Sequence, residues 1–537
     1  RRIRLRGLAV DETAELLAGV TGEAVAAPVA RAIHDRAEGN PFFATELARL
    51  LADDPRAGAA GLADPSVVTA ADVPAGVRDV VRHRLARLPE PTRELLQIGS
   101  VIGRDVALRL LTHVADRSLD DCIDVLEPAV VQRLLVMVPD DPSVLRFSHA
   151  LVREVLADGL TGLRRARLHV RVADALEATH PGVDDVAEIV AEHLWAASAI
   201  GAGPRAAAAL ERAADVAIRR TAMQIAEDFL TRAVQLRRSA EPSDAAIEAE
   251  AVATARLNAV ERARRGFIAS EPTFLRGQEL ARRVGRRDIL HEMMWVEWAA
   301  ADTACDFARA LPLARYFKEL AEQSDDPFEQ LLGTGAWGIQ CWHAGRMLEA
   351  RDHLDRSAAL AADDWVPEHA TLRFEAEQRL FVSGFSLHVH DLVGDLDDVE
   401  ARFGELAQRQ TDRFSGAVTW TESASGSAAL GDWERVVRSA RRGIEADPDV
   451  AFTFWGSGLQ MSLGAALMNL GEVDEGLALF RDARAQYLAA GTRTALGNYY
   501  SNAAIGLLLL GRVEDGAELV RAARHEVDTY GERWPEP

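Results

Sequence analysis

"LGEVDEGLALFRDAR" (residues 470–484) returns 40 residues later as "LGRVEDGAELVRAAR" (510–524), and a third copy, "LGDWERVVRSARRG", lies at 430–443. Each copy places a small turn residue ahead of an amphipathic helix. A period near 40 residues with this pattern is typical of stacked helical hairpins. Weaker copies begin at residues 265, 304 and 344. The sequence therefore predicts that residues 164–537 form a tetratricopeptide-like α-solenoid, a helical-repeat sensor arm.

A different pattern precedes the repeats. Helices are expected near 75–88, 91–101, 105–114 and 118–132, and "LLVMVPDDPSVLRFSH" (134–149) follows them. This last stretch predicts a β-hairpin, because two β-rich runs flank the turn residues Asp140, Asp141 and Pro142. Helices followed by a hairpin indicate a winged-helix domain, which we place at residues 73–163.

The first 72 residues predict the end of an α/β domain and a small helical lid. "RIRLRGLAVDETAELLAG" (2–19) predicts a short strand and then a helix that has Asp11 as N-cap and ends at Gly19. "EGNPFFATELARLL" (38–51) predicts another helix, because Asn40 suits the N-cap and Pro41 the first helical position. Residues 52–73 are rich in Ala, Gly, Pro and Asp and predict a loop. The fold class expected of the whole chain is predominantly all-α.

Composition and charge argue against nucleic acid and membrane as partners of these residues. The net charge of −22 disfavours nucleic acid, because binding to phosphates depends on Lys and Arg. The helix of the winged-helix domain best placed to read a DNA groove, "SLDDCIDVLEPAVVQR" (118–133), carries four carboxylates. The three cysteines lie far apart and fit a reducing cytoplasm. No apolar run approaches the roughly 18 residues that a membrane span needs, so we expect no membrane partner.

No motif in the sequence indicates catalysis or a metal ion. A GxxxxGK[ST] phosphate loop is absent, so these residues alone do not make a P-loop ATPase. "HEMMW" (291–295) lacks the second histidine of a zinc protease, and the two histidines of "HVHD" (388–391) do not share a helix face. Ser148 and His149 are neighbours without an oriented acid. We therefore predict neither catalytic nor metal-binding residues.

Eight of the ten tryptophans fall between residues 295 and 455, within the predicted solenoid. Such large rings usually fill gaps between helices. The alternative is that some of them line a pocket for a small inducer on the concave face. The candidates for this role are Trp295, Trp298, Trp337 and Trp342.

The chain resembles the STAND class of signalling ATPases in the order of three features: "EGNPFFATELARLL", then "LRFSHALVREVLADGL" (145–160), then a helical-repeat arm. In particular, the chain is similar to the large ATP-binding transcriptional regulators of the LuxR family, of the maltose-activator type. The resemblance implies a nucleotide, ATP or ADP, held mainly by a P-loop domain outside these residues. It implies that Gly39, Asn40 and Pro41 pack against that nucleotide, and that His149 contacts the β-phosphate of ADP.

The resemblance also implies a role. The chain would be the regulatory and sensor portion of a cytoplasmic, ATP-dependent transcriptional regulator. Its arm would receive a small-molecule inducer or a protein partner, and DNA would be bound only through a domain outside this span. We expect a preceding segment, because the chain begins "RRIRLRGL" without Met; a ligand-induced oligomer is left open. Two alternatives are the regulatory region of a nucleotidyl cyclase and a scaffold that binds only protein partners.

Overall fold

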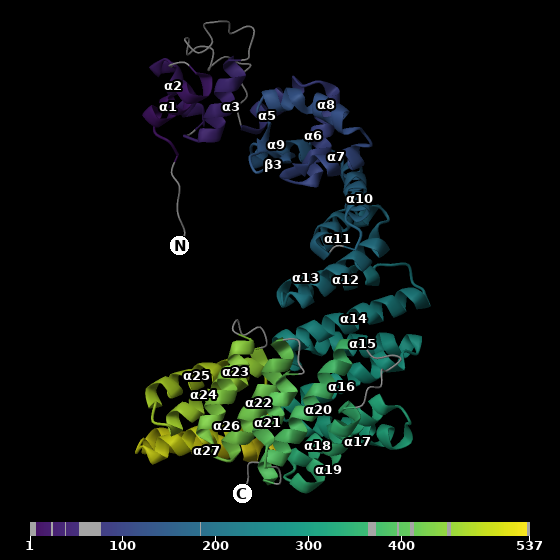
Figure 1. Cartoon of the computed structure of the whole chain (residues 1–537), viewed down its shortest axis with the longest axis vertical. Helices are drawn as coiled ribbons and strands as arrows, with labels where there is room; N and C mark the ends of the chain where they lie inside the picture. Colours follow the sequence, from purple (N-terminus) through teal and green to yellow (C-terminus); the bar gives the residue numbers. More distant parts are fainter. Residues whose placement is uncertain are drawn as a thin grey trace. The chain divides into compact units, whose positions relative to one another are not determined.

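The computed structural model describes residues 7–22, 25–37, 39–52, 77–182, 184–362, 372–394, 397–408, 413–447 and 453–533. The chain divides into two compact units, residues 1–206 and residues 207–537, each described separately below. Helices dominate both units, and one small sheet lies in the first (Figure 1). The predicted fold class, mainly helical with helical repeats, is confirmed.

The first unit contains two small modules. Its elements are α1 (Val10–Thr21), α2 (Ala27–Ala37), α3 (Pro41–Ala52), α5 (Val77–Ala86), α6 (Glu90–Ile102), β1 (Asp105–Ala107), α7 (Leu108–Ala115), α8 (Leu119–Val131), β2 (Leu135–Val138), β3 (Asp141–Phe147), α9 (Ala150–Asp158), α10 (Gly162–Thr179), η2 (Asp184–Val186), α11 (Ala187–Ala196) and η3 (Ser198–Ile200). Helices α1 to α3 bury a core that includes Leu17, Ile33 and Leu47, and Val80 of α5 belongs to the same core. A second core, around Leu96, Leu126 and Phe147, joins α5 to α9 with the sheet.

The first helix differs from the prediction at both ends. Its N-cap is Ala9, whose backbone N–H donates to Glu12 at 2.7 Å, so Asp11 lies inside the first turn. The helix continues through Gly19 to Thr21 and ends at Gly22, which adopts a left-handed φ of +77°. Glycine is tolerated within a helix when packing supports it, and Leu17 is fully buried here. The expected strand and loop fall mostly on residues 1–6 and 53–76, outside the described residues.

The three strands form one antiparallel sheet in the order β1-β3-β2. The predicted hairpin is confirmed as β2 and β3, but its turn is Pro139 and Asp140, and Asp141 already pairs with Val138. Residues 105–107 were expected to begin a helix and instead form β1. Pairing explains this difference, because Val106 is buried opposite Leu145 on the central strand.

The second unit is helical throughout its described residues. Helix α12 (Gly203–Arg219) contains the boundary between the units. The elements that follow are α13 (Met223–Arg238), α14 (Asp244–Arg265), η4 (Ile268–Ser270), α15 (Glu271–Val284), α16 (Arg287–Thr303), α17 (Phe307–Gln323), α18 (Pro327–His343), α19 (Met347–Ala362), α20 (Leu372–Val393), α21 (Val399–Gln408), α22 (Arg413–Ala429), α23 (Trp433–Ala446), α24 (Thr453–Asn469), α25 (Val473–Ala489), α26 (Leu496–Leu509) and α27 (Val513–Tyr530).

The sequence repeats coincide with the turns between paired helices. Gly431, Gly471 and Gly511 stand at equivalent places ahead of α23, α25 and α27, with φ between +74° and +99°. Only glycine adopts this left-handed conformation without strain, which explains the "LG" at the start of each copy. The repeats are therefore antiparallel helical hairpins, as predicted.

This arm, residues 207–533, curves until its last residues meet α16 and α18 (Figure 1). The backbone N–H groups of Arg493 and Thr494 donate to the carbonyl of Thr303 at 2.8 and 3.1 Å. The N–H of Arg533 donates to the carbonyl of His343 at 2.9 Å. These hydrogen bonds close the arm, and its concave side becomes an interior. None of the helices in the described ranges is long and apolar enough to cross a bilayer.

Gly39 is the position in the first unit where we expect substitution to matter most. Its φ is +72°, and a Cβ there would lie 2.7 Å from the carbonyl oxygen of Leu8. Gly39→Ala should destabilise α1 to α3 by about 1–3 kcal/mol, because both the backbone conformation and the contact are unfavourable. Hydrogen exchange of the amides in α1 to α3 measures the effect.

Gly19→Ala is the matched control. Gly19 lies inside α1, and a Cβ added there would meet no atom within 4 Å. Alanine should slow exchange there, because it stabilises a helix interior by about 0.5–1 kcal/mol relative to glycine. If Gly39→Ala and Gly19→Ala changed the hydrogen exchange of α1 to α3 equally, the backbone of Gly39 would not require glycine.

Candidate functional site

The Gly-Asn-Pro turn is built as its sequence indicates. The Oδ1 atom of Asn40 accepts hydrogen bonds from the N–H groups of Phe42 at 3.0 Å and Phe43 at 3.2 Å, and Pro41 begins α3. The carbonyl of Gly39 accepts from the N–H of Leu8 at 2.8 Å. Asn40 is therefore an N-cap, and the turn is anchored to the segment before α1.

The structure brings this turn next to His149. The imidazole of His149 stacks on the ring of Phe42, with centroids 3.6 Å apart and planes 16° apart. The N–H of Leu151 donates to Nδ1 of His149 at 3.3 Å, so His149 is the N-cap of α9. Because Nδ1 accepts, the proton of the neutral ring lies on Nε2, and the exposed ring can donate from there.

A buried ion pair holds the two modules of the first unit together. Arg84 of α5 binds Glu46 of α3, and the two side chains are 4% and 3% exposed. Arg84 also donates to the backbone carbonyl of Gln132. Breaking such a pair leaves an uncompensated buried charge, so it fixes α3 against α5. The Phe42–His149 contact thus lies between elements that are already fixed in place.

The interior of the arm contains a cavity with mainly aromatic walls. It encloses about 730 Å³ of space not filled by atoms, counting the part that is open to solvent. Sites for small molecules are typically lined in this way, mainly by apolar and aromatic side chains. The aromatic residues that line it are Phe267, Trp295, Trp298, Trp342, Phe381, Phe385, Phe454, Trp455, Tyr487 and Tyr499.

Three of the four candidate tryptophans line this cavity, and the fourth does not. Trp295 and Trp298, with ring centroids 5.2 Å apart, come from α16, and Trp342 comes from α18. Trp337, also on α18, is not among the lining residues, and its ring is covered by the ammonium of Lys318 at 4.9 Å. The indole N–H of Trp298 is buried without a hydrogen-bond partner among the described residues, and a ligand acceptor would satisfy it.

Several lining residues carried no sequence signal. Phe381 and Phe385 come from α20, Phe454 and Trp455 from the start of α24, and Tyr499 from α26. The helical period marks them as inward-facing but does not distinguish a cavity wall from an ordinary core. Their convergence depends on the closure of the arm, which no local pattern encodes.

A buried ion-pair cluster lies where the last residues of the arm meet α16 and α18. Nε2 of His343 is 3.1 Å from Asp302, and Nδ1 is 3.0 Å from Glu532. Burial lowers the pKa of His343, but the two carboxylates outweigh it and raise that pKa to about 10. Glu532 also accepts from the N–H of Ala495 at 3.0 and 2.9 Å. We call Asp302, His343 and Glu532 the clasp.

Glu422 is the second acidic group on the cavity wall. It is 6% exposed, and burial raises its pKa to about 8. Its Oε2 lies 3.5 Å from Nδ1 of His388, which also donates to the Glu422 carbonyl at 3.3 Å. Burial lowers the pKa of His388 to about 4. Both side chains are therefore mainly uncharged at pH 7.

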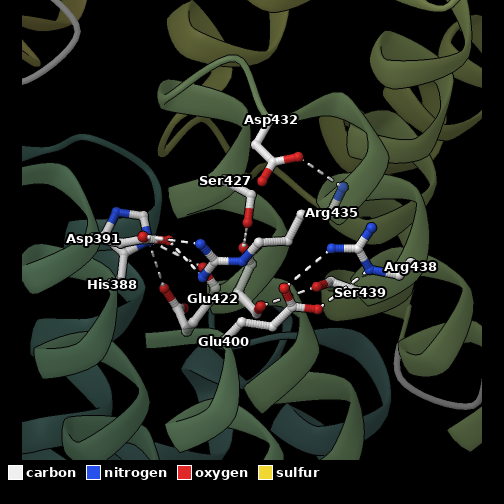
Figure 2. Close-up of polar contacts among 10 residues, drawn as sticks. His388, Asp391, Glu400, Glu422, Ser427, Asp432, Arg435, Arg438 and Ser439 are labelled. Atoms are coloured by element: carbon white, nitrogen blue, oxygen red, sulfur yellow. Dashed lines mark hydrogen bonds and ion pairs between the residues drawn. The ribbon is translucent and has the colours of Figure 1, made fainter. Parts of the chain in front are cut away.

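Beside the cavity, ion pairs join α20, α21 and α23 (Figure 2). Arg435 binds Asp391 through two hydrogen bonds of 3.0 and 2.8 Å, and both side chains are buried. Arg438 binds Glu400 in the same way at 3.2 and 3.1 Å. The "HVHD" motif is thus part of the packed interior of the arm. Among the described residues, no three His, Cys, Asp or Glu side chains are arranged to hold a metal ion.

No protein-family model matches the chain, and no curated protein matches its sequence. Among solved structures, it is similar to the STAND protein with a tetratricopeptide repeat sensor from Pyrococcus horikoshii. The TM-score is 0.50 and the identity 12%, over 99% of this chain and 74% of that chain. A Rap protein complexed with competence and sporulation factor matches with a TM-score of 0.36 and 11% identity, over 85% of this chain and 99% of that chain. The first likeness concerns the fold: the chain is a helical-repeat scaffold similar to a STAND protein with a repeat sensor.

The clasp predicts how the stability of the arm depends on pH. The pKa of His343 is about 10 in the folded arm and near 6.5 when unfolded, so its contribution is complete below about pH 6.5 and is lost as the pH rises to 10. His343→Gln should destabilise the arm by about 3 kcal/mol at pH 6. The difference from the unchanged chain should shrink toward pH 10.

Tryptophan fluorescence during denaturation measures this difference, because most of the tryptophans lie in the arm. His525→Gln is the control: His525 is exposed on α27 and should give the same unfolding curve as the unchanged chain at every pH. A destabilisation by His343→Gln that stays constant from pH 6 to pH 10 would exclude a charged His343 in the clasp.

Proposed function

We propose that this chain is the lid and sensor portion of an ATP-dependent STAND transcriptional regulator of the LuxR family, and that a small molecule in the arm cavity is its input. The observation that carries the proposal is the cavity inside the arm, which has mainly aromatic walls and, within them, the buried indole N–H of Trp298 without a hydrogen-bond partner among the described residues. A plain scaffold would present an open concave face to a protein partner.

The nucleotide side of the proposal rests on the first unit. Pro41 and His149 are both exposed, and the Phe42–His149 stack places them in one region of the surface. Nε2 of His149 remains available to donate to a phosphate oxygen, so the residues present fit a nucleotide. The N–H groups of Phe42 and Phe43 are already bound to Asn40. The start of α3 would therefore contact the nucleotide through Pro41 and not through these N–H groups.

The cavity can be tested with an uncharged dye, Nile red, whose fluorescence rises in apolar surroundings. We expect saturable binding of one dye to each chain. Trp342→Leu should weaken that binding about five- to tenfold, because it removes an aromatic wall. Trp337→Leu should leave the dissociation constant within about twofold, since Trp337 lies on the same helix but not on the cavity.

Thermal denaturation of each variant controls for loss of folding. Dye binding that does not saturate, or that responds equally to both substitutions, would favour the scaffold alternative over the sensor.

The nucleotide contact is tested in the protein that includes its nucleotide-binding domain. His149→Ala should lower the retention of ADP about tenfold, since a hydrogen bond to a charged group contributes about 1.5–3 kcal/mol. Ser148→Ala, at the exposed neighbouring residue, is the control. If ADP retention is the same in both variants, His149 serves only as the N-cap of α9.

A further inference from the structure

The charged groups on the cavity wall are acidic. The lining residues include Asp302 and Glu422, together with His343 and His388, but no lysine or arginine from the described residues. The two acids come from α16 and α22. A ligand in this cavity therefore meets carboxyl groups and aromatic rings, and the one cationic side chain among the lining residues, His343, is already paired with two carboxylates.

The clasp makes the region of Asp302 net negative. Two carboxylates share one imidazolium, and the remaining contact of Asp302 is a hydrogen bond from the neutral amide of Gln340. One negative charge is left over in a place that excludes most water. An anionic ligand would be repelled here, and a cation would be attracted.

The surroundings of Glu422 lack any basic counter-ion from the described residues. The groups that face it are the uncharged imidazole of His388 on α20 and the hydroxyls of Tyr487 and Tyr499 on α25 and α26. Burial raises the pKa of both tyrosines, so they too stay neutral. A buried acid that lacks a cationic partner is kept protonated, and a ligand cation would supply the missing charge.

The walls offer electron-rich ring faces for such a cation. Trp342 contacts His388, with ring centroids 5.7 Å apart, so one indole lies beside the partner of Glu422. A second lining indole, Trp455, contacts Phe381 at 6.2 Å. A cation over an indole face gains about 0.5–2 kcal/mol, with the larger values in desolvated sites. The aromatic rings and the acids of the cavity wall therefore both favour a cationic ligand.

We infer that the cavity ligand is an amine on an apolar body, whose ammonium group pairs with Glu422 and lies against the indole rings. The inference rests on the sensor role proposed above and specifies its ligand class. An amine that enters as an ammonium ion makes Glu422 release its proton to solvent. An amine that enters uncharged takes that proton from Glu422. In both cases the product is an ammonium–carboxylate pair.

Three probes with a common body and different head groups test the inference: phenylbutylamine, phenylbutanol and phenylbutyrate. Each competes with Nile red for the unchanged chain, for Glu422→Gln and for Glu475→Gln, a substitution of an exposed acid on α25. We expect phenylbutylamine to compete at least about tenfold better than phenylbutanol, and phenylbutyrate to compete least. Glu422→Gln should remove the preference for the amine, and Glu475→Gln should keep it.

A second measurement needs no variant. At pH 7, phenylbutylamine should release close to one proton per chain on binding, which calorimetry in buffers of different ionisation enthalpy detects, and phenylbutanol should release none. Equal competition by the amine and the alcohol, or no proton release, overturns the amine inference while the sensor proposal stands. Failure of Nile red itself to bind overturns the sensor proposal and, with it, this inference.

Discussion

The contact on which the arm depends is the buried imidazole of His343 between Asp302 and Glu532. Three charged groups taken out of water are costly unless they are paired. Here the two ion pairs of His343 are supported by hydrogen bonds from the N–H of Ala495 to Glu532 and from the amide of Gln340 to Asp302. The cluster can form only when the last residues of the arm return to α16 and α18. It therefore specifies the closed form of the arm, and in any open arrangement its charges would return to water.

Closure produces the cavity and its chemistry together. An open solenoid would leave its concave tryptophans in contact with solvent, whereas the closed arm buries Trp298 and Trp342 to within a few per cent. The same loss of water raises the pKa of Glu422 and lowers that of His388. Aromatic lining and an uncharged acid are thus two results of one event, the return of the last residues to α16 and α18.

The extent to which the sequence predicts this structure follows from the range of the interactions. Asn40, Pro41 and the repeat glycines act within a few residues, so their roles were predictable. β1 was missed because three residues carry too little pattern, and pairing with a distant strand decides them. Trp337 and Trp342 were both predicted to line a pocket because tryptophans are frequent in this part of the sequence. They lie on one helix, but Trp342 lines the cavity and Trp337 contacts Lys318. Glu422 and the clasp meet only through long-range closure, which a local period does not contain.

The clasp and the cavity also share a segment of the chain, so a ligand bound in the cavity can stabilise the closed conformation of the arm. Thr494 and Ala495 line the cavity, while the N–H of Ala495 binds Glu532 and the N–H of Thr494 binds the carbonyl of Thr303. A ligand that fills the cavity contacts these residues only when the arm is closed. Its binding energy then adds to that of the clasp, and a ligand can shift an equilibrium only by its difference in affinity for the two states. A factor of about 10⁴ in that affinity is enough to convert a mainly open population to a mainly closed one.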